Sequence, residues 1–189
     1  MIRTLLVLIP ALCIAGCVKD VVRYGDARAT ETVTNEFGST DLQMIAGDMT
    51  QSLLKHPVLA GVESPVFTVQ EVKNKTSEYI DTRAITDSIR SELLKSGKVK
   101  FAVDSAGMEE QVDELNRQQG ELYERRQAAK TGRMVGADYR LEGNISSIVK
   151  KAEDTRDVYY KFNLQLWEIE SGLLAWNDEK EIRKTTTRE

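Results

Sequence analysis

One cysteine near the start of the chain has neighbours that favour a specific covalent modification. Residues 12–17 read LCIAGC and follow a short apolar run, which is preceded by a single positive residue, Arg3. A basic residue, an apolar run and then small residues are typical of a secretory signal peptide (1–16). Small residues before Cys17 suit a signal peptidase, and the Cys17 thiol is the group that would carry diacylglycerol. We therefore expect lipidation of Cys17; the alternative is an ordinary cleaved signal with an incidental cysteine.

Acylation of Cys17 would hold the chain at a membrane surface. Each buried methylene contributes about 0.8 kcal/mol, so more than one acyl chain gives stable anchoring. The apolar run 5–14 is too short to cross a bilayer, which takes ~20 residues. Val18 rather than Asp follows the cysteine, and in Gram-negative lipoprotein sorting this favours the outer membrane. The sequence thus predicts a lipid-anchored protein on the periplasmic face of the outer membrane.

Composition and motifs argue against several function classes. The 189 residues include 26 basic and 30 acidic side chains, and this mild acidity disfavours nucleic-acid binding. His56 is the one histidine and has no cysteine or second histidine nearby in sequence, so we expect a solvated helix end rather than a metal site. The chain has no glycine-rich phosphate loop, nucleophile elbow or Cys/His cluster. We therefore expect no catalytic residues, cofactor, metal or small-molecule substrate, and no enzymatic activity.

Sequence patterns divide the mature chain into three parts. Residues 17–40 are polar and lack proline, and we interpret them as a lipidated N-terminus with a flexible linker. A coil of this length has a root-mean-square reach of only ~25–30 Å. Residues 41–182 have the size and apolar content of a single globular domain, and residues 183–189 read as a polar tail.

Apolar residues at helical spacing mark the helices of this domain. Stripes predict helices at 41–55, 82–96 and 105–119, carried by Leu42, Ile45, Met49 and Leu53, by Ile85, Ile89 and Leu93, and by Met108, Val112 and Leu115. A fourth, basic helix is expected over 123–135. Its Arg125, Arg126, Lys130 and Arg133 form a candidate docking surface, although a solvated face is the simpler interpretation. Strands are expected at 65–72 and 99–104, with a turn at 73–77.

Strict alternation of apolar and polar residues dominates the last third of the chain. It covers 139–150, 158–167 and 174–179, with turn residues between the segments. Three successive segments of period two predict an antiparallel meander with one buried and one solvated face. With the helices on one face, the fold class is an α/β domain of the α+β type. It is a two-layer sandwich with a mixed, mostly antiparallel sheet.

The solvated face of the meander is our candidate partner-binding surface. Exposed aromatic residues surrounded by polar groups are typical of binding hot spots. The residues expected there are Trp167, Tyr159, Ile148, Lys161 and Arg140. The alternative is that a loop or the linker covers Trp167.

Several stretches, taken in order behind the Cys17 motif, resemble the penicillin-binding-protein activator LpoB family of outer-membrane lipoproteins. They are residues 40–41, 69–76 (VQEVKNKT), 93–98 (LLKSGK), 135–139 (VGADY) and 171–176 (SGLLAW). The resemblance implies a fold like the small N-terminal α/β domain of TolB. It also implies binding to a class A penicillin-binding protein, stimulation of peptidoglycan synthesis and no catalytic residues. Members of that family carry a long, proline-rich linker, whereas residues 17–40 here are short. The alternative is an assembly or structural lipoprotein of the envelope that binds another periplasmic or outer-membrane partner.

Overall fold

The structure is a computed structural model that describes residues 22–30 and 33–187. Cys17 and the predicted signal peptide lie outside the described residues, so lipidation stays a prediction. Within the described part of the chain, no helix is long and apolar enough to cross a membrane.

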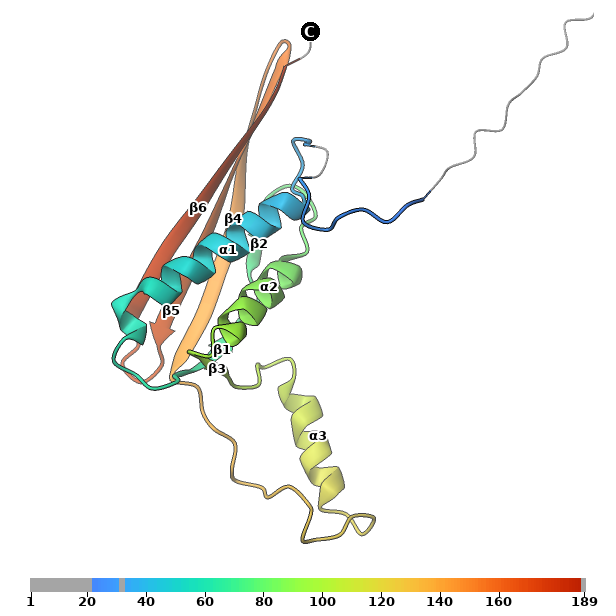
Figure 1. Ribbon diagram of the computed structural model, residues 1–189, viewed down its shortest axis with the longest axis vertical. Helices are drawn as coiled ribbons and strands as arrows, with labels where there is room; N and C mark the ends of the chain where they lie inside the picture. Colours follow the sequence, from blue (N-terminus) through green and yellow to red (C-terminus); the bar gives the residue numbers. More distant parts are fainter. Residues whose placement is uncertain (1–21, 31–32, 188–189) are drawn as a thin grey trace, which may run out of the picture.

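A six-stranded mixed sheet forms one layer of the molecule (Figure 1). Its strands are β1 (Val66–Val69), β2 (Lys73–Lys75), β3 (Lys100–Phe101), β4 (Tyr139–Ala152), β5 (Thr155–Glu168) and β6 (Leu174–Thr187). The order is β3-β1-β4-β5-β6, and β2 also pairs with β4. Pairs among β1 to β4 are parallel, whereas β4, β5 and β6 form the antiparallel meander that the sequence predicts. The predicted fold class is therefore confirmed.

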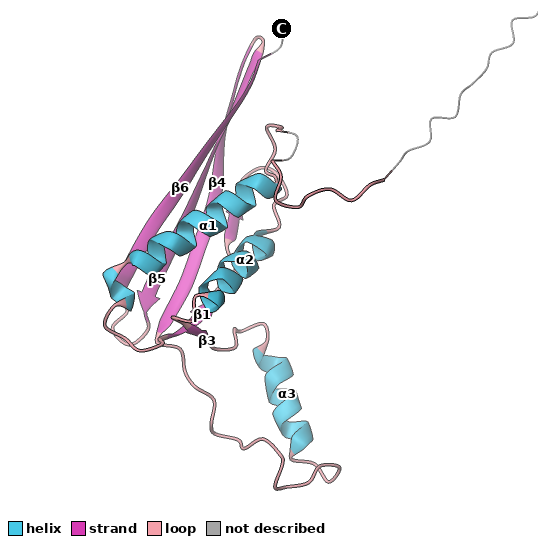
Figure 2. Cartoon of the chain, in the orientation of Figure 1, coloured by secondary structure: helices cyan, strands magenta, loops and turns pink. Residues whose placement is uncertain are grey.

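Two helices, α1 (Ser39–Lys55) and α2 (Thr82–Lys95), cover one face of this sheet (Figure 2). The Asp81 carboxylate accepts the backbone N–H groups of Arg83 and Ala84 and so caps α2. Gly97 follows α2 at φ +69°, a left-handed conformation that suits glycine after a helix end. A short 3₁₀ turn (Pro57–Leu59) follows α1, which ends before Pro57 as the sequence predicts.

The core lies between these helices and the inner face of the sheet. The fully buried large side chains come from both layers: Ile45, Met49, Leu53, Ile85, Ile89, Leu93, Phe67, Leu141, Ile145, Tyr160, Phe162 and Leu166. Gly143 sits in the inner row of β4, where a Cβ atom would lie only 2.5 Å from the carbonyl oxygen of Asn163. The close approach of β5 therefore requires glycine at this position.

Residues 35–38, which we call the N-terminal clasp, lie against the sheet although the sequence places them in the linker. The Tyr160 hydroxyl is 2.8 Å from the Asn35 carbonyl oxygen and also bonds to the Glu78 carboxylate. The ring of Phe37 packs edge-on against Tyr160, with 5.9 Å between ring centres. Burial, followed by the bond to Glu78, raises the pKa of Tyr160. The contacts of the domain with its N-terminal segment therefore begin before α1.

Several element boundaries differ from the sequence-based expectations. Residues 73–75 form β2 rather than the predicted turn, because they pair with Asn144 to Ser146 of β4. Strand β3 has only two residues instead of the expected six. At the other end, β6 runs to Thr187, through the segment expected to be a tail, because its backbone pairs with β5 as far as Thr155.

The largest departure is the arm, which we define as residues 102–138 between β3 and β4. It contains α3 (Met108–Gln118), a helix with no buried residue that extends away from the sheet (Figure 1). The prediction of a basic helix over 123–135 is wrong, since this stretch forms turns and exposed loop. Gly132 there has φ +73°, a conformation that no helix interior tolerates.

Candidate functional site

The five predicted partner-binding residues lie together on the outer face, which is the face of the sheet opposite α1 and α2. Arg140 of β4 is directly opposite Trp167 of β5, and Ile148 is directly opposite Tyr159. Lys161 lies between them and pairs with Ser146. Directly opposed residues in a sheet project from the same side. Cross-strand pairing therefore places all five side chains in one array.

Apolar groups stand at the two ends of this array. Ile148 is 58% exposed beside Tyr159, and Trp167 is eight residues further along β5. At about 3.3 Å per residue, the two aromatic rings are ~26 Å apart along the strand. This spacing suits contact with the surface of another macromolecule better than enclosure of a small molecule.

Hydrogen bonds and ion pairs fill the middle of the outer face. Lys161 Nζ lies 2.6 Å from Glu179 Oε2, and this interaction raises the pKa of Lys161. Asn163 Nδ2 donates to Asn177 Oδ1 at 2.8 Å. The array is therefore polar at its centre, with the donors and acceptors of β5 and β6 already oriented by their neighbours.

Tyr159 is held by groups from β6. The guanidinium of Arg183 lies 5.4 Å from the centre of the Tyr159 ring and also pairs with Asp157 at 2.6 Å. The carboxylate of Glu181 interacts with the Tyr159 hydroxyl and raises its pKa. The Tyr159 phenol therefore stays protonated at neutral pH and donates its one hydrogen bond to Glu181.

Trp167 has no hydrogen bond that would fix its ring. Its Nε1 is shielded from solvent and has no hydrogen-bond partner among the described residues. The Nε of Arg140, directly opposite, is equally shielded and lies 3.4 Å from Glu142 Oε2 without forming a hydrogen bond. Most shielded polar groups are paired in folded proteins. These two neighbouring donors are therefore exceptions within the array.

Sequence reasoning missed one member of the outer face, Leu174. Alternation placed Leu174 in the same inward row as Trp176. A bulge between Leu166 and Trp167 breaks this period, so that Leu174 pairs with Trp167 and is 45% exposed. Nothing in the sequence indicates the bulge. The exposed Leu174 adds apolar area beside Trp167.

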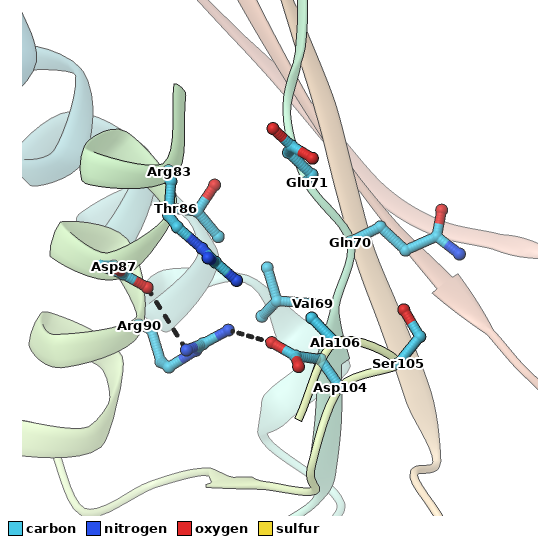
Figure 3. A pocket seen from close by; sticks show the side chains of 10 residues that line it. All are labelled: Val69, Gln70, Glu71, Arg83, Thr86, Asp87, Arg90, Asp104, Ser105 and Ala106. Carbon is cyan, nitrogen blue, oxygen red and sulfur yellow. Dashed lines mark hydrogen bonds and ion pairs between the residues drawn. The ribbon is translucent and has the colours of Figure 1, made fainter. Parts of the chain in front are cut away.

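A polar hollow of about 300 Å³ lies elsewhere, between α2 and the ends of β1 and β3 (Figure 3). Arg90 bridges Asp87 at 3.3 Å and Asp104 at 3.0 Å. The backbone N–H of Gly107 and the Arg90 guanidinium lower the pKa of Asp104, which keeps that carboxylate ionised. The Thr86 hydroxyl bonds to the Thr82 carbonyl oxygen at 3.0 Å. Arg90 is therefore paired with both carboxylates, and Asp104 with its lowered pKa is a poor general acid at neutral pH.

The other predicted positions do not assemble into a site. His56 ends α1, where its Nδ1 accepts the backbone N–H of Val58 at 3.2 Å. Arg125, Arg126, Lys130 and Arg133 are exposed in the loop of the arm. Among the described residues, no three His, Cys, Asp or Glu side chains are grouped so as to hold a metal ion.

Comparison with known proteins gives a family and several similar solved structures. Residues 41–182 match the model of a family described as peptidoglycan-synthase activator LpoB. The solved C-terminal domain of LpoB from Escherichia coli is 19% identical, with a TM-score of 0.48, over 75% of this chain and 98% of that one. The same domain from Salmonella enterica is 18% identical, with a TM-score of 0.46 and the same coverage. Lipoprotein GNA1162 from Neisseria meningitidis is 16% identical, with a TM-score of 0.42, over 64% of this chain and 83% of that one. These structures are too distant to support inferences about function, and no curated protein sequence matches the chain.

Proposed function

This chain belongs to the peptidoglycan-synthase activator LpoB family, and from that membership we propose that it is an outer-membrane lipoprotein that binds and activates a class A penicillin-binding protein. The lipid on Cys17 holds the domain at the periplasmic face of the membrane. The outer face of the sheet binds the synthase, and the bound synthase then polymerises and cross-links peptidoglycan faster.

The observation that carries this proposal is the array on the outer face. No helix of the described chain covers β4, β5 and β6 on that side (Figure 1). An aromatic residue with polar neighbours is the usual composition of a binding hot spot, and Trp167 beside Leu174 and Arg140 has it. An acceptor on the partner would give the Trp167 indole N–H the hydrogen bond that it lacks among the described residues.

We further propose that the chain has no enzymatic activity of its own. Arg90 in the polar hollow is paired with Asp87 and Asp104, and Asp104, with its lowered pKa, is a poor proton donor at neutral pH. The aromatic and charged side chains of the outer face are spread along a strand rather than gathered in a cleft. Both features support a binding role.

A second candidate partner is another protein of the outer membrane or periplasm. The N-terminal clasp supports this candidate because it shortens the linker. Because Asn35 is bonded to Tyr160 and Arg156, only residues 18–34 separate the lipid-bearing cysteine from the domain. Even fully extended, 17 residues span at most about 60 Å. A synthase anchored in the inner membrane must therefore reach toward the outer membrane to meet this domain, whereas a resident of the outer membrane need not.

The proposed function is tested by reconstituting the full lipidated chain with a purified class A penicillin-binding protein in detergent. We expect faster glycan polymerisation and cross-linking than with the synthase alone, and no turnover of cell-wall precursors by the chain alone. Unchanged synthase rates would contradict the activator role. Turnover by the chain in the absence of synthase would contradict the non-enzymatic role.

A further inference from the structure

Two charged side chains in the polar hollow beside α2 have no partner of their own (Figure 3). Arg83 reaches into the hollow from α2, and Glu71 lies on the strand side, in the segment that follows β1. Among the described residues, neither side chain forms an ion pair or a hydrogen bond, whereas Arg90 is shared between two carboxylates. An unpaired cation and an unpaired anion therefore line the same hollow.

The position of the hollow in the fold suits a ligand. It lies outside the carboxyl ends of β1 and β3, which are neighbouring parallel strands. In open sheets with parallel strands, ligands commonly bind in the crevice at this end. A volume of about 300 Å³ is at the lower end of the range for ligand pockets. The hollow is therefore large enough for a small molecule or the end of a peptide.

The charges of the hollow exclude several ligand classes. Its lining includes three carboxylates and two guanidinium groups. A nucleotide or polyphosphate would bring several negative charges close to the three carboxylates. An apolar molecule would take charged groups out of water without replacing their hydrogen bonds. Among the described residues, these carboxylates are not grouped so as to hold a metal ion. The fitting ligand is small and carries both signs of charge.

The position of Arg83 indicates which group it would bind. Alongside the Gly107 N–H and Arg90, the charge of Arg83 lowers the pKa of Asp104, so its guanidinium acts on the interior of the hollow. A guanidinium presents parallel N–H donors that match the two oxygens of a carboxylate. Glu71 offers acceptors for an ammonium group, and the excess of carboxylates in the lining favours the same positive group.

We propose that this hollow binds the free amino-acid end of a peptide, in which one carbon carries both an ammonium and a carboxylate. Arg83 binds the carboxylate and Glu71 binds the ammonium, while the rest of the peptide extends into solvent. The hollow is on the α2 side of the sheet. The outer face therefore stays free to bind a protein at the same time.

Two cell-wall tripeptides that differ in a single carboxylate test this proposal. L-Alanyl-γ-D-glutamyl-meso-diaminopimelate has an ammonium and a carboxylate on the last carbon of its side chain, whereas L-alanyl-γ-D-glutamyl-L-lysine has the ammonium alone. Each is titrated into the full lipidated chain in non-ionic detergent, and binding is followed by NMR of the peptide signals. The choice of probe rests on the proposed periplasmic location. No synthase is present, so the result does not depend on the activator role.

We expect the wild-type chain to bind the diaminopimelate tripeptide about tenfold more tightly than the lysine tripeptide, because only the former gives Arg83 its carboxylate. Arg83→Gln should abolish this preference. Glu71→Gln should weaken binding of both peptides, since both carry the ammonium. Arg83 and Glu71 are exposed, so thermal unfolding should show an intact fold in both variants. Arg125→Gln removes an exposed guanidinium from the arm, outside the hollow, and should behave as wild type.

Three results would overturn the proposal. The first is equal affinity of the wild-type chain for the two peptides, or no binding of either. The second is a preference that persists in Arg83→Gln, because another group would then bind the carboxylate. The third is an equal loss of preference in Arg125→Gln, which would mean that overall charge rather than the hollow attracts the peptide.

Discussion

Helices α1 and α3 have similar sequence patterns but lie in opposite environments. Both carry apolar residues at intervals of three and four, yet Leu53 of α1 is fully buried whereas Val112 of α3 is 42% exposed. The stripe of α1 is longer and is widened by Ala46 and Thr50, which are also buried. The comparison shows that periodicity predicts a helix and the direction of its apolar face. It does not identify what that face packs against.

The stability contributions of the two helices can be compared by shortening one apolar side chain in each. Leu53→Ala should lower the free energy of unfolding by about 2–5 kcal/mol, because it leaves a cavity in the core. Val112→Ala should change it by no more than about 0.5 kcal/mol. Urea denaturation of dilute protein measures both. Similar losses from the two substitutions would mean that α3 packs on the body in solution.

The stability contributions of the two helices can also be compared by breaking one ion pair in each. Lys184 pairs with Asp41, whose side chain is 3% exposed, and Lys184→Met leaves that carboxylate buried without its cation. We expect a loss of about 3 kcal/mol in the free energy of unfolding. Arg117 pairs with Glu114 on the exposed surface of α3, and Arg117→Met should cost less than about 1 kcal/mol. Thermal unfolding at neutral pH compares the two, and equal costs would contradict the burial of the Asp41–Lys184 pair.

The N-terminal clasp is tested by Tyr160→Phe, which removes the hydroxyl bonded to Asn35 and Glu78. At pH 8 we expect a loss of about 1–2 kcal/mol in unfolding free energy and faster amide exchange at residues 35–38. The pKa of Tyr160 is higher in the folded chain than in the unfolded one, so the contribution of this phenol is present below pH ~10 and is lost above it. The difference between wild type and variant should therefore shrink above that pH. A constant difference would show that the hydroxyl is not buried.

Removing the whole arm should also have only a small effect on stability. Replacement of residues 108–134 by a flexible Gly/Ser linker leaves the Arg90–Asp104 pair in place and takes away no buried side chain. We expect the unfolding free energy to change by no more than about 1 kcal/mol. Loss of cooperative unfolding in calorimetry would show that the arm is part of the core.

The sequence predicts those parts of the fold in which local pattern and burial agree. Alternation along β4 and β5 holds because each strand has one face on the core, and this places Arg140, Trp167 and Tyr159 on the same face of the sheet without knowledge of the structure. The end of α1 before Pro57 follows from local chemistry in the same way, because the residue before a proline avoids the helical conformation.

The remaining features depend on contacts between distant residues. The bulge that moves Leu174 to the outer face is set by the pairing of β5 with β6, not by any residue in β6 alone. The N-terminal clasp forms because the Tyr160 hydroxyl bonds to Glu78 and to Asn35, which is more than a hundred residues from Tyr160. The stretch 123–135 forms an exposed loop rather than the expected helix. Charge and spacing alone do not show whether a segment has a surface to pack against.

Direct binding to a purified class A penicillin-binding protein, measured by calorimetry with the full chain in detergent, tests the central claim that the outer face is the docking surface. We predict that Trp167→Ala weakens binding at least tenfold while thermal unfolding shows an intact fold. Tyr79→Ala removes a ring that is 93% exposed and lies outside the array, so it should leave the affinity unchanged. Equal affinities for the two variants, or no binding by the wild-type chain, would contradict the account.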